Sequence, residues 1–319
     1  MRKVYHEFWI WILIMNRNVV KQYFEENSSA WMHDAYENSG HNYQTPAHRL
    51  RILTSFLDRT KGIASAVDLG CGGGKVTLEM ARRGIHVTAV DEAAAMIRTA
   101  QELFEAQPEE IRQRISLVQS DLMDWPMQTS DCVAAMGLIG YLKNDDMLFR
   151  KAAAGLNKGG YFIVSFRNRL FNIFSISHRT INEVRNGAFE ELVAEADALY
   201  QSVDPESVTR FLQALQEASS QCSARPDMPA PAQKAPTPDY SGSVEARQST
   251  PQQAIAAGEE HGFSNVGLFG VHPHILTPGL NRLLPPGVYN TLSNALIPFE
   301  SHPLALLWSS AFIGIFQKR

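Results

Sequence analysis

The sequence predicts an α/β protein built around a doubly wound, mostly parallel sheet. The first observation is a short apolar strand at Ala66 and Val67, which runs into a glycine-rich turn and then a helix over residues 75–83. The second is another apolar strand over residues 86–90, which ends in Asp91. A strand, turn, helix and strand in this order form a parallel, right-handed crossover. The chain has 319 residues, a length that suggests one or two domains.

Composition and charge exclude several classes of protein. Hydrophobic residues make up 45% of the chain and charged residues 19%, which excludes a disordered, collagen-like or polytopic membrane protein. The net charge is −4, so no basic excess indicates a nucleic-acid partner. The 3 cysteines have no C-x-x-C spacing and are too few for a disulfide framework. We therefore expect a cytoplasmic protein with no structural zinc.

Residues 1–45 are expected to form a helical N-terminal flap. A charged start precedes the apolar run Phe8–Met15, which is too short for a hydrocarbon core that needs about 20 residues. A signal peptide is one interpretation, but no small-x-small cleavage site follows. The others are a helix packed on the body, a peripheral membrane contact, or an upstream extension of a protein that once began at Met15. Helical patterns follow over residues 18–31 and 46–57.

The glycine-rich turn has the features of a nucleotide site. It reads Asp68-Leu69-Gly70-Cys71-Gly72-Gly73-Gly74, and glycines let the backbone turn sharply and approach a ligand. Asp91 is placed to accept hydrogen bonds from both ribose hydroxyls. A dinucleotide fingerprint needs a third glycine where this chain has Lys75 or Val76, and Asp68 would repel a pyrophosphate. An acid there suits a ligand with an ammonium group and no phosphate, such as S-adenosylmethionine.

At these residues the chain resembles the class I S-adenosylmethionine-dependent methyltransferases, a Rossmann-like family. VDLGCGGG is similar to motif I of the family, and VTAVDEAAAMI to the segment that carries the next acid. The resemblance covers roughly residues 45–167 and 250–319 and implies a seven-stranded sheet with an antiparallel last strand. The later matches, in the order of the family, are Ser120-Asp121-Leu122 with Trp125-Pro126 at the third strand, residues 131–142 at the fourth, residues 156–164 at the fifth, a helix opened by Thr250-Pro251, a sixth strand through Phe269 and a seventh over residues 311–317.

The resemblance also implies roles for individual residues. The residues expected to bind the cofactor are Asp68, Gly70, Cys71, Gly72, Gly74, Asp91, Glu92, Asp121, Leu122 and Gly137. Asp68 is expected at the methionine end, Asp91 at the ribose and Asp121 at the adenine. Asp124 is an alternative adenine neighbour, either of the two acids could instead cap a turn, and the glycines could merely shape theirs. Cys71 is interpreted as a small loop residue, because nothing nearby would favour a thiolate.

The acceptor side is less constrained by the sequence. Methyl transfer requires an acceptor atom in line with the methyl carbon and, for a hydroxyl or an ammonium, removal of a proton. The loop after the fourth strand reads Gly137-Leu138-Ile139-Gly140-Tyr141 and lacks the D/N-P-P-Y/F motif of base methyltransferases. Tyr141, His178 and His272 are candidate catalytic residues, and each could instead be a packing or solvated residue. His272 and His274 have no acid nearby in sequence, so we expect no metal site.

Two segments exceed what the bare fold requires. Residues 168–249 combine a helical pattern over residues 182–215 with a stretch rich in Pro, Ala, Ser and Gln, which predicts a helical cap over the acceptor pocket with a flexible tether. Residues 278–308 are apolar and interrupted by prolines. They could be the helix that covers the sheet, an entrance for a lipid-linked acceptor, or a dimer surface.

The expected organisation is a flap over residues 1–45, a core over 46–167, the cap over 168–249 and the rest of the core over 250–319. The expected function is methyl transfer from S-adenosylmethionine to an oxygen or nitrogen of a small molecule or glycan. One alternative is a lipid- or quinone-type acceptor at a membrane surface, with a peripheral membrane contact. The other is a cofactor-binding protein without catalysis. The sequence predicts no particular oligomeric state.

Overall fold

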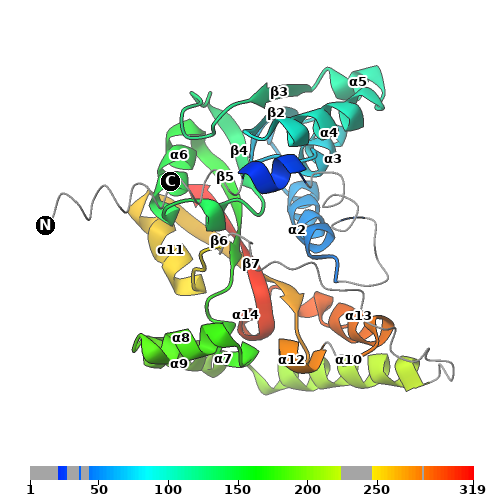
Figure 1. The fold of residues 1–319 in the computed structure, drawn as a ribbon, viewed down its shortest axis with the longest axis vertical. Helices are drawn as coiled ribbons and strands as arrows, with labels where there is room; N and C mark the ends of the chain where they lie inside the picture. Colours follow the sequence, from blue (N-terminus) through cyan, green and yellow to red (C-terminus); the bar gives the residue numbers. More distant parts are fainter. Residues whose placement is uncertain (1–20, 27–35, 37–42, 224–245, 282–283) are drawn as a thin grey trace, which may run out of the picture.

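The computed structural model describes residues 21–26, 36, 43–223, 246–281 and 284–319. Its centre is a seven-stranded sheet with the order β3-β2-β1-β4-β5-β7-β6, shown in Figure 1. The strands are β1 (Ser65–Leu69), β2 (His86–Asp91), β3 (Ile115–Gln119), β4 (Ser130–Ala135), β5 (Leu156–Arg167), β6 (Phe263–Pro273) and β7 (Ser309–Lys318). β1 to β5 pair in parallel, and β7 lies antiparallel between β5 and β6. The predicted fold class and its antiparallel last strand are confirmed.

Helices cover both faces of this sheet because its strand residues alternate between two cores. On β1, Val67 and Leu69 pack in one core with Phe149, whereas Ala66 packs in the other core with Leu53. Successive side chains of a strand point to opposite faces, and a parallel sheet is normally buried on both. The first core is covered by α6 (Asp145–Gly155) and α11 (Pro251–Glu260), and the second by α2 (Thr45–Arg59) and α3 (Lys75–Arg82), with α4 (Ala94–Glu105) and the short α5 (Glu109–Arg112) beside α3.

Capping residues in the sequence fix several helix ends. The Thr250 side chain accepts a hydrogen bond from the Gln253 backbone, the Gln253 side chain accepts one from the Thr250 backbone, and Pro251 occupies the first turn of α11. This is the helix start predicted from the sequence. After α3 the chain reverses at Gly84, whose φ of +83° belongs to the left-handed region that favours glycine. These ends keep the connections short and set where each strand begins.

The strand order reverses between β1 and β4, and this reversal positions the site. In open α/β sheets, ligands bind outside the carboxyl ends of the strands at such a switch point. The loops that follow β1 and β4 meet there, since a Cβ on Gly70 would lie 3.1 Å from the Leu138 side chain. The β4 loop continues into the short helix η1 (Ile139–Tyr141).

The helical insertion differs from the prediction. The pattern over residues 182–215 forms parts of three helices rather than one, because the chain turns at Gly187, with φ +70°, and restarts at Pro205. The helices are α7 (Asn172–Ser175), α8 (His178–Arg185), α9 (Phe189–Gln201) and α10 (Pro205–Ser223). They gather at one end of the molecule, below the sheet in Figure 1.

The apolar segment before β7 packs against this insertion. It forms α12 (Pro278–Asn281), α13 (Pro286–Asn294), η3 (Ile297–Phe299) and α14 (Pro303–Trp308). Phe211 of α10 stacks on Trp308 with ring centroids 4.6 Å apart and meets Phe299 edge-on at 5.8 Å. Packing within the fold therefore accounts for much of the apolar character of both segments.

The described part of the N-terminus is a helical segment over residues 21–26 that docks on α4. The Glu25 carboxylate accepts hydrogen bonds from the backbone of Ala94 at 2.6 Å and of Ala95 at 2.9 Å. An acid at a helix N-terminus satisfies free N–H groups and the helix dipole. The expected apolar run Phe8–Met15 and most of the proline-rich stretch lie outside the described residues.

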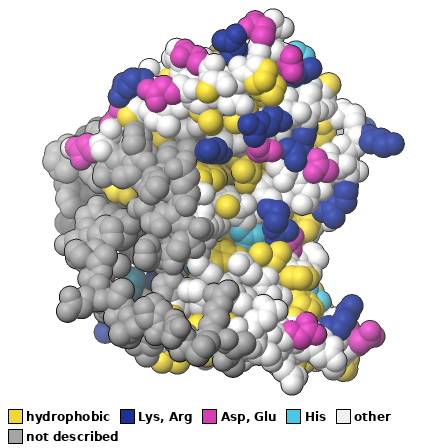
Figure 2. Space-filling model, turned by 90° about the vertical axis from the view of Figure 1, so that its right-hand side faces the viewer, with side chains coloured by type: hydrophobic (Ala, Val, Ile, Leu, Met, Phe, Trp, Pro, Cys, Tyr) yellow, Lys and Arg dark blue, Asp and Glu magenta, His cyan; other side chains and the backbone are white. Residues whose placement is uncertain are grey.

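Charge on the visible surface is mixed. On the face shown in Figure 2, basic and acidic side chains of the described residues alternate rather than forming a single basic stripe. Within the described ranges, no helix is long and apolar enough to cross a membrane.

Candidate functional site

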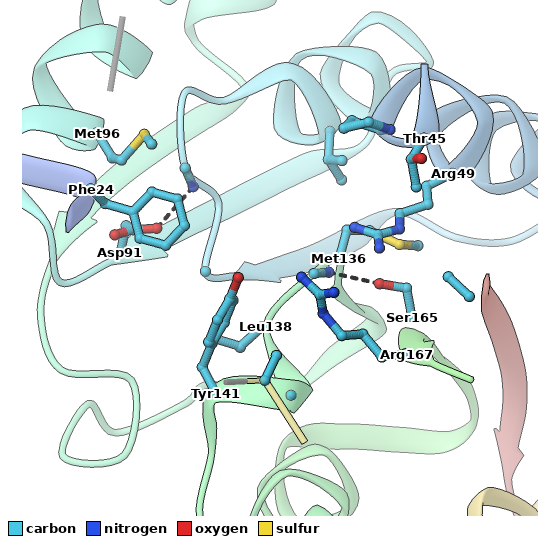
Figure 3. Close-up of a pocket in the computed structure, with 18 of the residues that line it drawn as sticks. Phe24, Thr45, Arg49, Asp91, Met96, Met136, Leu138, Tyr141, Ser165 and Arg167 are labelled. Carbon is cyan, nitrogen blue, oxygen red and sulfur yellow. Dashed lines mark hydrogen bonds between the residues drawn. The ribbon is translucent and has the colours of Figure 1, made fainter. Parts of the chain in front are cut away.

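A pocket of about 420 Å³ opens at the switch point of the sheet. Small-molecule and cofactor sites commonly measure about 300–1,000 Å³. Of its acidic lining residues, Asp91 ends β2 and Glu92 comes next in the chain. Two of its basic lining residues, Arg49 of α2 and Arg167 of β5, lie together and away from Asp91 (Figure 3). We call these regions the acidic end and the cationic end.

Asp91 is held in place by the glycine loop. Its Oδ2 accepts a hydrogen bond from the backbone of Gly72 at 2.9 Å, and its Oδ1 accepts one from the backbone of Ala93 at 2.9 Å. Burial raises the pKa of the Asp91 carboxyl above its usual value, and these hydrogen bonds oppose that shift. A carboxylate offers about four lone pairs. Each oxygen therefore keeps acceptor capacity for a ligand hydroxyl.

The three predicted glycines divide into two roles. Gly70 and Gly72 line the pocket, whereas Gly74 caps α3 with φ +81° and is not among the lining residues. A Cβ at Gly74 would lie 2.5 Å from a ring carbon of Phe104. Gly74 thus allows α3 to approach α4 closely.

Asp68 lies beneath the loop rather than in the pocket lining. Its side chain is buried, and its Oδ2 accepts a hydrogen bond from the Thr77 hydroxyl at 2.7 Å. Burial raises the pKa of this carboxyl to about 7. The structure therefore gives Asp68 a hydrogen-bond partner on α3, and its contact with the cofactor stays a prediction. Cys71 is also buried outside the lining, and burial raises the pKa of its thiol.

Leu122 and Gly137 line the pocket as predicted, but Asp121 does not. The Asp121 Oδ1 accepts a hydrogen bond from the backbone of Met123 at 2.8 Å. This short-range bond caps the turn after β3, the alternative role considered for this acid. The loop after β3 nevertheless places Leu122 at the acidic end of the pocket.

Aromatic residues from distant parts of the chain wall the pocket. Phe24 of the N-terminal segment lies in front of Asp91 in Figure 3 and meets Tyr141 of η1 edge-on, with ring centroids 6.2 Å apart. Tyr36 also lines the pocket, and burial raises the pKa of its hydroxyl to about 12. Tyr141, predicted from the β4 loop, is therefore in the site. Phe24 and Tyr36 were not predicted there.

The cationic end contains two arginines that sequence reasoning also missed as site residues. The Arg49 guanidinium abuts Gly137, since a Cβ there would lie 3.0 Å from its Nη1, and its Nε is buried without a hydrogen-bond partner. Burial, and next the charge of Arg167, lower the pKa of Arg49 to about 10. Within the described residues neither arginine forms an ion pair.

The two candidate histidines, His272 and His178, lie in different parts of the structure. His272 lines the pocket, where its Nδ1 lies 3.1 Å from the Thr45 hydroxyl and its Nε2 lies 2.8 Å from the Tyr289 hydroxyl. Burial lowers the pKa of His272 well below its usual value, so the ring is neutral. His178 instead begins α8, is exposed and does not line the pocket. The structure does not bring His178 to the site.

The predicted cap does not cover this pocket with its helices. Of the described residues between 168 and 249, Ala246 alone lines it. The neighbouring Arg247 holds the returning chain, because its Nε donates to the Leu142 carbonyl at 2.7 Å. α9 packs with α14 and α10 with α13, while α8 packs with α7 and α9, so these helices lie at the far end. Among the described residues, no group of three or more His, Cys, Asp or Glu side chains is placed to hold a metal.

Comparison with known proteins supports the resemblance seen in the sequence. A family model described as a methyltransferase domain matches residues 66–160. The ubiquinone biosynthesis O-methyltransferase of Xylella fastidiosa (strain 9a5c) is 28% identical over 140 residues, which are 43% of this chain and 56% of that protein. The namesake from Xanthomonas oryzae pv. oryzae (strain PXO99A) is 28% identical over 137 residues, 42% of this chain and 57% of that one. The chain thus spans a little over half the length of these relatives.

Solved structures share the fold at low identity. Magnesium protoporphyrin IX methyltransferase from Synechocystis PCC 6803, with bound SAH, aligns with a TM-score of 0.53 and 11% identity over 95% of this chain and 100% of that one. The [4+2]-cyclase SpnF aligns with a TM-score of 0.50 and 15% identity over 94% of each chain. At such identities the likeness shows the fold alone, and one neighbour is named for a different reaction.

Proposed function

We propose that this chain, a member of the class I S-adenosylmethionine-dependent methyltransferase family through its domain at residues 66–160, transfers a methyl group from S-adenosylmethionine to a small-molecule acceptor. The observation that carries this proposal is that Asp91, the glycine loop and Arg49 all line the same pocket. S-adenosylmethionine has two ribose hydroxyls in its adenosine part and a carboxylate in its amino-acid part. Both ends of the pocket offer matching groups.

The residues present fit this cofactor. Asp91 would accept hydrogen bonds from the ribose hydroxyls with its remaining lone pairs. Arg49 would pair with the methionine carboxylate, and it has no competing acid among the described residues. A guanidinium matches a carboxylate with two parallel hydrogen bonds. Gly70 and Gly72 leave room for the ligand between these contacts.

For methyl transfer, the protein must orient the acceptor and exclude water from the pocket. The bound cofactor supplies an electrophilic methyl group on a sulfonium. Phe24 and Tyr141 form an aromatic wall that would shield the pocket from water. The Thr45 hydroxyl, which lines the pocket and is hydrogen-bonded to His272, would orient an acceptor hydroxyl. Tyr141 would orient the acceptor.

We propose an oxygen atom of a small molecule as the methyl acceptor. The relatives named as ubiquinone biosynthesis O-methyltransferases favour a second candidate, a quinone-type acceptor, and the aromatic wall accommodates an aromatic ring. The similarity to them covers 43% of this chain in the first case.

The test is direct transfer of a labelled methyl group. The protein is incubated with methyl-labelled S-adenosylmethionine and a panel of hydroxybenzoates, catechols, amino sugars and a short-chain demethylated quinol. We expect label in at least one hydroxyl-bearing acceptor, with S-adenosylhomocysteine as the co-product. Label in the quinol alone selects the quinone-type candidate. Tight binding of S-adenosylmethionine with no transfer across this panel and a metabolite extract would refute the enzymatic proposal.

A further inference from the structure

We propose that the methyl acceptor carries a carboxylate and that Arg167 binds it at the cationic end of the pocket. This inference rests on the proposed function, because it assigns the second ligand of the same pocket. It makes Arg167 a residue that determines acceptor specificity.

Arg167 is positioned for a ligand and has no partner in the part of the chain that the structure describes. It is the last residue of β5, its side chain is exposed and lines the pocket, and Figure 3 shows it pointing toward the space beside Tyr141 and Arg49. No hydrogen bond or ion pair joins its side chain to the described residues. Two residues later, Arg169 is bound by Glu183 at 2.6 Å. The fold therefore pairs Arg169 with an acid and leaves Arg167, at the end of β5, facing the pocket.

The charges at the cationic end favour binding of a second anion. Arg49 and Arg167 are close enough that the charge of Arg167 contributes to lowering the pKa of Arg49. Among the described residues no acid lines that end, because the lining acids Asp91 and Glu92 lie at the other end. Two like charges close together repel each other, and a bound anion relieves this repulsion. The cofactor carboxylate would pair with Arg49, which leaves Arg167 to bind an anion of the acceptor.

A hydroxyl beside Arg167 completes a carboxylate site. Ser165 also lines the pocket, and residues two apart on a strand share one face, about 7 Å apart along it. Its Oγ accepts a hydrogen bond from the Gly137 backbone at 2.7 Å, and its proton has no acceptor among the described residues. One guanidinium and one hydroxyl match the two oxygens and single charge of a carboxylate. A phosphate dianion would bring more charge than Arg167 alone neutralises.

The experiment measures binding of matched probes to protein saturated with S-adenosylhomocysteine. Three pairs differ only by a carboxylate: 3,4-dihydroxybenzoate and catechol, 4-hydroxybenzoate and phenol, and benzoate and benzene. Phenyl phosphate is included as a phosphoryl probe. Titration calorimetry is run on the native protein, on Arg167→Gln and on Arg185→Gln, which removes the same charge from an exposed position on α8. Binding of S-adenosylhomocysteine is measured first for all three.

We expect the native protein to bind at least one carboxylate probe tenfold or more tightly than its neutral partner. Arg167→Gln should lose this preference while its affinity for S-adenosylhomocysteine stays within about threefold, as expected when one charged hydrogen-bond donor is removed. Arg185→Gln should keep the preference. A native protein without any carboxylate preference, a preference that survives in Arg167→Gln, or tighter binding of phenyl phosphate than benzoate would overturn the inference. Failure of the native protein to bind S-adenosylhomocysteine would instead overturn the proposed function, and this inference with it.

Discussion

Replacing Gly74 with alanine should destabilise the fold by two separable effects. Gly74 has φ +81°, a conformation that costs an L-residue about 1–2 kcal/mol. The added Cβ would also lie 2.5 and 2.7 Å from two ring carbons of Phe104, and overpacking of this kind typically costs about 1–3 kcal/mol. The free energy of unfolding should therefore fall by about 2–5 kcal/mol.

Gly84→Ala is the matched control for the backbone effect. Gly84 has nearly the same φ, +83°, and no heavy atom lies within 4 Å of the added Cβ. Its substitution should cost only the backbone contribution of about 1–2 kcal/mol. Urea unfolding followed by circular dichroism gives both midpoints, with equal slopes required for the comparison.

A second substitution tests the packing contribution alone. The loss of stability in the double variant Gly74→Ala/Phe104→Leu should be smaller than the sum of the losses in the two single variants. The reason is that Phe104→Leu removes the ring that the new Cβ meets. Equal midpoints for Gly74→Ala and Gly84→Ala would refute the assignment of Gly74 to close helix packing.

Three further predictions concern the pocket and its support. Burial raises the Asp68 pKa from 3.8 to about 7, so the folded state holds a proton that the unfolded state has lost, and stability falls as pH rises from about 4 to about 7. Asp68→Asn should remove that loss, so at pH 8 the variant should be more stable than the native protein by up to about 4 kcal/mol, and at pH 3 it should have no advantage. Urea unfolding at both pH values measures this. Equal stability of the two proteins at pH 8 would contradict the raised pKa. Glu25→Gln weakens the contact of the N-terminal segment with α4, so titration should show S-adenosylmethionine binding at least threefold more weakly, whereas Glu26→Gln should not change it. Arg49→Gln should weaken the same binding by more than tenfold, and Arg150→Gln, an exposed control, should leave it unchanged; matching affinities for Arg49→Gln and the control would remove Arg49 from the cofactor site.

The core of the fold could be predicted because its determinants are local. The glycine turn, the strand ending in Asp91 and the cap at Thr250 each follow from a few adjacent residues. Short, nearly continuous apolar runs then place the strands in a sheet covered on both faces. The predicted Asp91, Glu92, Gly70 and Leu122 all line the pocket.

The cationic end could not be predicted because its residues converge only in three dimensions. Arg49 lies on α2 and Arg167 at the end of β5, and nothing in the local sequence marks either as lacking an acidic partner. Arg167 and Arg169 look alike in sequence, but only Arg169 meets Glu183.

Contacts between residues far apart in the sequence also explain why Asp68 and His178 do not lie where the sequence suggested. Asp68 seemed suited to a ligand ammonium from its place before the glycines, yet the structure turns it toward Thr77 beneath the loop. His178 was placed at the acceptor side by its position after β5, but the insertion carries it away on α8.

The most direct test of the central claim is titration calorimetry of S-adenosylmethionine into the native protein and Asp91→Ala. The control is Asp197→Ala, which removes an exposed acid on α9. The account predicts measurable binding to the native protein and to the control, and affinity more than tenfold lower for Asp91→Ala, because the ribose hydroxyls lose their charged acceptor. Unchanged affinity in Asp91→Ala would contradict the assignment of this pocket to the cofactor.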